Sequence, residues 1–90
     1  MLNSIFTSPF KKSRKLMQKR GKNLDKLTEV IDLLINEQPL LSRHEDHPLH
    51  GKWRGKRGCH IEPDWALIYR IDKTAGEVIF YDTGSHSDLY

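Results

Sequence analysis

The 90-residue sequence predicts an α+β fold, in which two N-terminal helices pack on one face of a small antiparallel sheet in the order β-α-α-β-β-β, with a short C-terminal turn. Apolar residues at helical spacing are confined to the first half of the chain, and three alternating or apolar runs with short connections fill the second half. A hydrophobic content of 37% in so short a chain supports one core. We therefore expect a single domain over residues 1–90.

The first expected elements are a short strand and a basic helix. Residues 2–7 alternate in the manner of a strand. Ser8 as N-cap before Pro9 predicts the start of a helix, and Gly21 is placed for a left-handed C-terminal cap, so we expect a helix over residues 9–20. Six of its twelve positions are Lys or Arg, so most of its surface must face solvent or phosphate groups.

A second helix and a long loop follow. Asn23 can cap this helix, because apolar residues from Leu24 to Leu34 recur at spacings of three and four. Pro39 ends the helical pattern. Residues 36–51 then predict a loop, and loops of this length in compact domains are often functional.

Three strands are expected over residues 53–60, 64–71 and 77–82, where Trp, Ile, Tyr, Val and Phe are frequent. Turns at 62–64 and 73–76 join them. Because such short connections join antiparallel neighbours, we expect an antiparallel sheet with one face covered by the helices and the other available.

Charge and composition narrow the classes of function. Fifteen Lys and Arg against twelve Asp and Glu give a net charge of +3, and residues 1–26 alone, with eight Lys or Arg and one Asp, carry +7, so a polyanion is the favoured partner. No apolar run approaches the roughly 20 residues of a membrane span, and we recognise no signal peptide. The single cysteine, Cys59, excludes an internal disulfide and favours a cytoplasmic setting. A chain this small leaves no enclosed cavity for a cofactor, and none is expected.

All five histidines lie in the second half of the chain. His44, His47 and His50 are regularly spaced, but Pro48 interrupts any helix that would align them and only one thiol is available, so we do not expect a metal site. Taken singly, His44 and His50 are interpreted as solvated surface residues.

His60 and Asp64 flank a predicted turn from which both side chains can project to one edge. An imidazole can give or take a proton near neutral pH, and a carboxylate can orient it and stabilise its cationic form, so a functional pair is one interpretation and a turn-stabilising Asp64 is the other. Near the C-terminus, His86 and Tyr90 lie four residues apart and would share one face of a single helical turn.

The sequence closely resembles the YafQ branch of the RelE/ParE toxin superfamily in three segments, at residues 47–53, 59–69 and 83–90. The basic start of the first helix and the second helix match this branch as well, so the resemblance covers nearly the whole chain. The histidine set is specific to this branch, because gyrase-directed ParE-type relatives generally lack it. The family often ends in Phe where this chain has Tyr90.

The resemblance implies a RelE-like domain that is the toxin of a bacterial type II toxin–antitoxin pair, a ribonuclease that enters the ribosomal A site and cuts mRNA there. The partners it implies are a cognate antitoxin protein, the ribosome with its RNA, and mRNA, with no membrane. It also implies that Tyr90 lies close to the substrate and that the acid–base set is His47, His60, Asp64 and His86.

Histidines and basic side chains suffice to cut RNA through its own 2′-hydroxyl without a metal ion. We expect His86 to be one member of the acid–base pair and His47 or His60 to be the other, with Asp64 holding His60 in its useful tautomer. Which histidine is the acid and which is the base stays open.

Several further side chains are candidates for contact with the substrate. Trp53 and Trp65 are interpreted first as packing residues, with base stacking as the alternative, and Tyr90 either stacks on a base or packs against Trp65 or Tyr69. Basic residues before His60 are expected at the scissile phosphate, and each could instead belong to a solvated face. The candidate substrate-binding residues are Lys52, Arg54, Lys56, Arg57, Trp65 and Tyr90.

Two other functions compete with RNA cleavage. One is a non-catalytic basic module that binds RNA or a protein and merely blocks it, and the other is a gyrase-directed, ParE-like toxin. The fold alone cannot separate these possibilities. The histidine set favours cleavage, because blocking requires only positive charge and shape.

Overall fold

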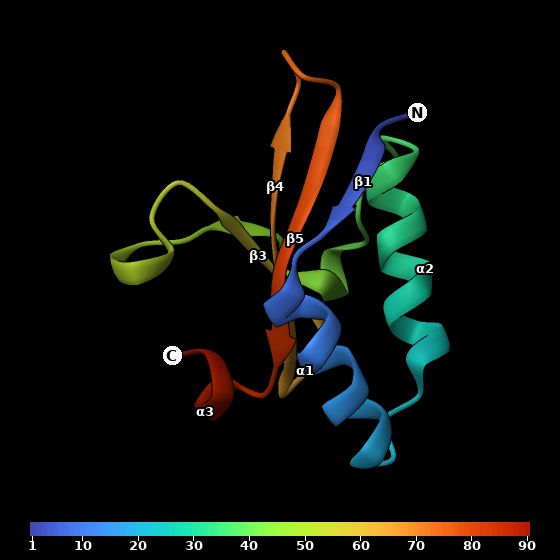
Figure 1. Ribbon diagram of the computed structural model, residues 1–90, viewed down its shortest axis with the longest axis vertical. Coiled ribbons are helices and arrows are strands. Elements are labelled where there is room, and N and C mark those ends of the chain that lie inside the picture. The colour runs from blue at the N-terminus through green and yellow to red at the C-terminus, as the bar shows by residue number, and fades with distance from the viewer.

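A five-stranded sheet carries two helices on one of its faces in the computed structural model, which describes residues 1–90 (Figure 1). The α+β class expected from the sequence is confirmed. The helices are α1 (Ser8–Lys19), α2 (Leu24–Ile35) and the single turn α3 (His86–Leu89), with two 3₁₀ turns, η1 (Ser42–His44) and η2 (Gly51–Trp53). The strands are β1 (Asn3–Phe6), β2 (His47–Pro48), β3 (Arg57–Glu62), β4 (Trp65–Asp72) and β5 (Glu77–Gly84).

The strand order is β1-β5-β4-β3-β2. β3, β4 and β5 form an antiparallel meander, as their short connections predict. β1 instead pairs parallel to β5, from Asn3 opposite Glu77 to Phe6 opposite Phe80. The helices and the other strands lie between β1 and β5 in the chain and supply the crossover that a parallel pair requires. The sheet is therefore mostly antiparallel. The parallel pair of β1 and β5 is the exception, which the short connections between β3, β4 and β5 could not predict.

The N-terminus of α1 is tied to the sheet by Thr7. Its Oγ1 accepts a hydrogen bond from the backbone N–H of Phe10 at 3.3 Å and donates one to the carbonyl of Phe80 at 2.8 Å. The N-cap is therefore Thr7 rather than the expected Ser8, which lies inside the first turn. The Thr7 hydroxyl both caps the helix and fixes it to β5. Sequence signals for the start of a helix cannot distinguish a cap at Thr7 from a cap at Ser8.

A short connection joins α1 and α2, and each helix buries one stripe of apolar residues. Gly21 has a φ of 83° after the end of α1, and the Asn23 side chain accepts from the N–H of Asp25 at 3.0 Å, so both expected caps are confirmed. The stripes pack on the sheet and form the main core, whose largest fully buried members are Trp65, Tyr69, Phe10, Phe80, Met17, Leu27 and Leu67.

A second, smaller cluster lies on the opposite face of the sheet, where Leu49, Ala66, Ile68 and Leu89 are buried together. Leu89 thereby docks α3 on this face. Gly58 makes the close approach of Leu49 possible, because a Cβ at that position would lie 2.9 Å from Leu49 Cδ2. Among the helices, only the short α3 contributes a buried residue to this cluster, and α1 and α2 do not cover this face.

The segment before β3 differs most from expectation. The strand expected over 53–60 begins only at Arg57, because Gly51 and Gly55 have φ values of 65° and 85° and turn the chain through η2. The loop expected over 36–51 contains η1 and β2. The other two expected strands are present, with ends shifted by no more than two residues. None of the helices is long and apolar enough to cross a membrane.

Candidate active site

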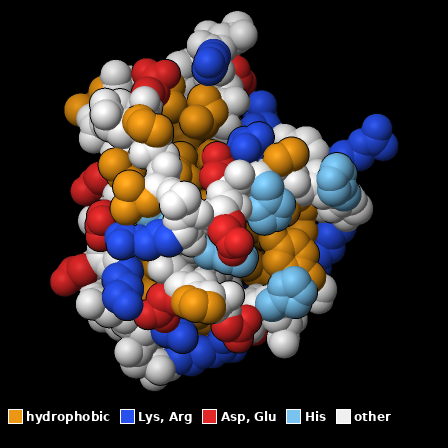
Figure 2. All heavy atoms as spheres, turned by 180° about the vertical axis from the view of Figure 1, so that it is seen from behind, with side chains coloured by type: hydrophobic (Ala, Val, Ile, Leu, Met, Phe, Trp, Pro, Cys, Tyr) orange, Lys and Arg blue, Asp and Glu red, His pale blue; other side chains and the backbone are white.

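The candidate histidines come together on the face of the sheet that α1 and α2 leave uncovered. Side chains alternate along β3, so Cys59 enters the main core whereas His60 lies beside Ala66 on the open face. Ala66 also pairs with Gly84, so Gly84 lies about two strand spacings, roughly 10 Å, from His60. His86 follows shortly after Gly84 in the chain. Figure 2 shows histidine side chains gathered around an apolar patch on this face.

Two of these histidines are held by one residue, Glu45. The Nδ1 atom of His47 lies 2.6 Å from the backbone carbonyl oxygen of Glu45. The Nδ1 atom of His60 lies 2.9 Å from the Oε2 atom of the same residue. Neither Nε2 atom has a hydrogen-bond partner within the protein, so each ring keeps one free nitrogen.

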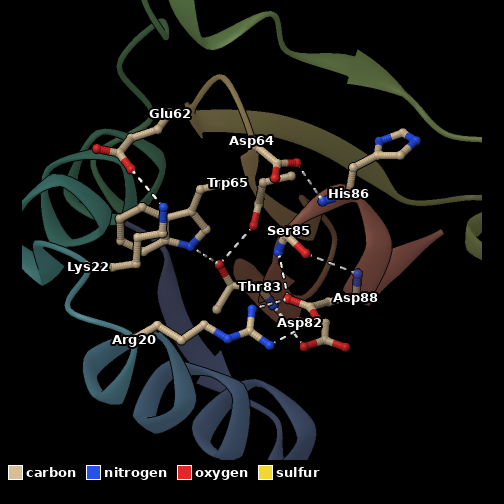
Figure 3. A network of polar contacts seen from close by, with 11 residues as sticks. Arg20, Lys22, Glu62, Asp64, Trp65, Asp82, Thr83, Ser85, His86 and Asp88 are labelled. Carbon is tan, nitrogen blue, oxygen red and sulfur yellow. Dashed lines mark hydrogen bonds and ion pairs between the residues drawn. The ribbon is translucent and has the colours of Figure 1, made fainter.

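Asp64 holds His86 rather than His60. Its Oδ1 atom accepts a hydrogen bond from the backbone N–H of His86 at 3.1 Å, while the His86 ring points away from it (Figure 3). The expected contact between His60 and Asp64 is absent. The β3–β4 register shifts between His60 and Glu62, and this irregularity breaks the alternation that would have aimed both side chains at the same edge.

α3 is anchored by further polar contacts that Figure 3 shows in part. Asp88 forms a bidentate ion pair with Arg20 at the end of α1, with N···O distances of 2.6 and 3.1 Å. It also accepts a hydrogen bond from the backbone N–H of Ser85 at 2.8 Å. The hydrogen bonds from Arg20 and Ser85 hold the pKa of Asp88 far below its usual range. The indole N–H of Trp53 donates to the carbonyl of Leu89 at 2.9 Å. The short helix that carries His86 is thus tied to α1 and η2.

The aromatic residues expected near the substrate have different environments. Tyr90 is 48% exposed and its ring packs on that of His86, with centroids 4.8 Å apart, rather than on Trp65 or Tyr69. Trp65 is 1% exposed and its indole N–H donates to Thr83 Oγ1 at 2.9 Å. Because its ring is buried in the core, Trp65 cannot stack on a base. Its environment therefore agrees with the interpretation of Trp65 as a packing residue.

Two of the four expected cations lie over aromatic rings of the open face. The Lys56 ammonium lies 4.7 Å from the centroid of the Tyr81 ring, and that of Lys52 lies 5.4 Å from the Trp53 ring. Both aromatic rings pack against the small apolar cluster of this face. Arg54 is exposed and forms no ion pair. These side chains remain available to an anionic ligand.

Arg57 belongs to the other face. Its Nε and Nη2 atoms each lie 3.3 Å from Asp46, which also accepts the Tyr69 hydroxyl hydrogen bond at 2.6 Å. Hydrogen bonding to Asp46 raises the pKa of Arg57, and burial raises that of Tyr69. Alternation along β3 puts Arg57 with Cys59 on the helix side, so its expected place among the substrate-binding residues is not supported.

The family model described as a bacterial toxin of a type II toxin–antitoxin system, YafQ, matches residues 2–90. The chain belongs to the YafQ toxin family.

Relatives in this family are similar over almost their whole length. The mRNA interferase toxin YafQ of Escherichia coli strain K12 is 43% identical over 86 residues, which cover 94% of this chain and 91% of the relative. The crystal structure of E. coli YafQ matches with a TM-score of 0.93 and 38% identity, covering 100% of this chain and 99% of that one. The E. coli DinJ–YafQ toxin–antitoxin complex matches with a TM-score of 0.90 and 40% identity, covering 99% and 97%. The family expected from the sequence is confirmed.

Sequence reasoning missed three residues of this YafQ family member. Arg70 Nε donates to the Tyr81 hydroxyl at 3.2 Å, which adds a cation to the open face. Glu45 stands two positions before His47, but spacing alone could not tell which carboxylate reaches a histidine. His44 is buried rather than solvated, and its Nδ1 accepts the N–H of Leu41 at 3.2 Å while burial lowers its pKa. His44 is therefore a structural residue.

Groups for a metal ion or for thiol chemistry are not assembled. No three His, Cys, Asp or Glu side chains are arranged to hold a metal ion. Cys59 is fully buried, and burial raises the pKa of its thiol to about 12.

Proposed function

We propose that this chain is an endoribonuclease toxin that cuts mRNA in the ribosomal A site by metal-independent acid–base catalysis. The observation that carries the proposal is the open face, on which the imidazoles of His47, His60 and His86 keep free ring nitrogens. The same face carries Lys52 and Lys56, neither of which forms an ion pair. The name of the E. coli relative, an mRNA interferase toxin, supports it.

The proposed reaction uses the substrate's own nucleophile. One imidazole takes the proton of the 2′-hydroxyl as the 2′-oxygen bonds to phosphorus. The bond from phosphorus to the 5′-oxygen breaks, and a second, protonated imidazole gives its proton to that oxygen. The products are a 2′,3′-cyclic phosphate and a 5′-hydroxyl, so no water or metal ion is needed for the cut.

We assign His86 to one of these two proton transfers and His47 or His60 to the other. Asp64 serves by holding the start of α3 through the His86 N–H. Lys52, Arg54 and Lys56 neutralise the phosphorane, whose extra charge needs positioned cations. The exposed ring of Tyr90 stacks on a base next to the cut.

The basic face of α1 is proposed to grip ribosomal RNA. Four of its lysines are exposed and form no ion pair within the protein, which leaves them free for phosphate groups. This contact depends on charge and not on base sequence, so raised salt should weaken ribosome binding. The lysines are Lys11, Lys12, Lys15 and Lys19.

We further propose that a cognate antitoxin covers the basic surface with an acidic or amphipathic helical segment. The support is the family to which the chain belongs and the complex of the E. coli relative with DinJ. Steering by charge should make association fast and sensitive to salt. An association rate that is equal at low and high ionic strength would contradict this.

The decisive test is single-turnover cleavage on programmed ribosomes with two substrates. An all-ribose mRNA should be cut, with or without EDTA once ribosome integrity is controlled, and should yield a 2′,3′-cyclic phosphate. A 2′-deoxy substitution at the cleaved nucleotide should abolish the cut. Cleavage of the deoxy substrate would point to water as nucleophile, and growth arrest without any cut would favour a binding module or a gyrase-directed toxin.

A further inference from the structure

We propose that Glu45 is the positioning residue for two acid–base histidines, holding His47 through its backbone carbonyl and His60 through its carboxylate so that both rings present Nε2 to the substrate. This inference rests on the proposed function, in which these imidazoles move protons. It gives Glu45 the task that the sequence suggested for Asp64, whose carboxylate reaches His86 instead.

The backbone of Glu45 is suited to serve both rings. Its φ of 46° and ψ of 47° are left-handed, a conformation that is unfavourable for a residue other than glycine. Its N–H donates to the carbonyl of Ser42 at 3.1 Å, so it is fixed to the end of η1. The chain reverses there, and the carbonyl and the carboxylate reach different rings. A strained residue beside candidate catalytic groups supports a functional reason for the strain.

The two contacts determine which nitrogen carries the proton. A carbonyl oxygen only accepts hydrogen bonds, so the Nδ1 of His47 at 2.6 Å must be the donor. An ionised carboxylate also only accepts protons, so the Nδ1 of His60, which forms an ion pair with Glu45 at 2.9 Å, carries the proton on that side of the ring. In a neutral ring the free Nε2 is then the acceptor, and in a charged ring it is the donor. Each ring therefore uses Nε2 for proton transfer.

Glu45 supplies the only carboxylate in contact with His60. No second carboxylate comes within 4.0 Å of a His60 ring nitrogen. The groups nearest in the chain are engaged elsewhere, since Asp46 binds Arg57 and the Nδ1 of His44 accepts the N–H of Leu41. Removing the Glu45 side chain should therefore leave the His60 ring free to rotate and to change tautomer.

The Glu45→Gly variant separates the two contacts. Glycine adopts a left-handed backbone without penalty, so the carbonyl contact to His47 should persist while the contact to His60 disappears. Nitrogen NMR of the imidazoles should then show the His60 signals moving toward a mixture of tautomers and those of His47 unchanged. We expect kcat for cleavage to fall about tenfold or more, with KM changed less than about twofold.

A second variant and a matched control sharpen the measurement. Glu45→Gln keeps an acceptor oxygen at the same reach, so it should restore the His60 tautomer and part of kcat. Glu37 is the other non-glycine residue with positive φ, 55°, and it is also an exposed glutamate. Glu37→Gly should change neither the His60 signals nor kcat, which controls for glycine at a left-handed position.

The two readouts keep the outcomes distinct. His60 signals that do not move in Glu45→Gly, or wild-type kcat in that variant, would overturn the positioning role. A wild-type chain that cuts no mRNA on ribosomes would overturn the proposed function, while the NMR comparison would still decide whether Glu45 sets the His60 tautomer.

Discussion

The two faces of the sheet hold similar polar groups in opposite ways. On the covered face, Arg57 and the Tyr69 hydroxyl both donate hydrogen bonds to Asp46, and the Trp65 indole donates one to Thr83. These polar groups therefore satisfy one another's hydrogen-bonding capacity. On the open face, each of the candidate imidazoles keeps at least one nitrogen without a partner.

Neighbouring residues in the chain divide between these two faces. Glu45 reaches His60 on the open face and Asp46 reaches Arg57 on the other, while Cys59 is buried beside the half-exposed His60. The polar side chains of the covered face are therefore paired within the fold, whereas the imidazoles of the open face keep nitrogens without a partner. Variants of the two faces should therefore separate stability from cleavage.

The largest effect is expected on the open face, from His86→Ala. Loss of a general acid or base should slow single-turnover cleavage on the order of 100-fold or more, whereas the melting temperature should hardly change, because the ring is exposed. Ser87→Ala, the exposed neighbour on α3, is the matched control and should cut at the wild-type rate. Full activity of His86→Ala at equal protein level would remove His86 from the catalytic pair.

The opposite result is expected on the covered face, from Trp65→Phe. The change deletes a buried hydrogen bond to Thr83 and leaves a small void, so the free energy of unfolding should fall by about 1–3 kcal/mol. Cleavage measured well below the melting transition should stay near wild type. Lost cleavage with an unchanged transition would return Trp65 to the substrate site and break the contrast between the faces.

Tyr90→Ala tests a residue that the fold hardly buries. Base stacking on an aromatic ring is worth about 1–3 kcal/mol, so cleavage should slow about tenfold or more. The melting temperature should be unchanged, and Tyr90→Phe should cut normally if only the ring matters. A lowered melting temperature in Tyr90→Ala would instead assign the ring to packing on His86.

The smallest effect concerns the ion pair that links α1 to α3. The pKa of Asp88 is lower in the folded chain than in the unfolded one, so the pair stabilises the fold above the unfolded pKa of about 4 and loses this contribution as pH falls below it. Because the pair is solvated, Asp88→Asn should cost less than about 1 kcal/mol at pH 7. Denaturant unfolding at several pH values should show the two proteins converging in acid, and a constant difference would contradict this origin.

The sequence alone determined the elements whose causes are local. Apolar spacing, Asn23 and Gly21 predicted the two helices, and short turns predicted the β3–β4–β5 meander. The motif residues predicted the family, which the match over residues 2–90 confirms. These features depend on near neighbours in the chain, and a periodic pattern records them directly.

Only the tertiary structure decided which candidates share a face. Alternation along β3 places Arg57 on the covered face, and Trp65 is buried in the core. Because the β3–β4 register is irregular after His60, Asp64 contacts His86 instead. Glu45 is then the partner of His60. Each outcome depends on register, or on a loop folding back over the sheet. A one-residue change of register reverses the face of every side chain that follows, so spacing along the chain could name the candidates but not their partners.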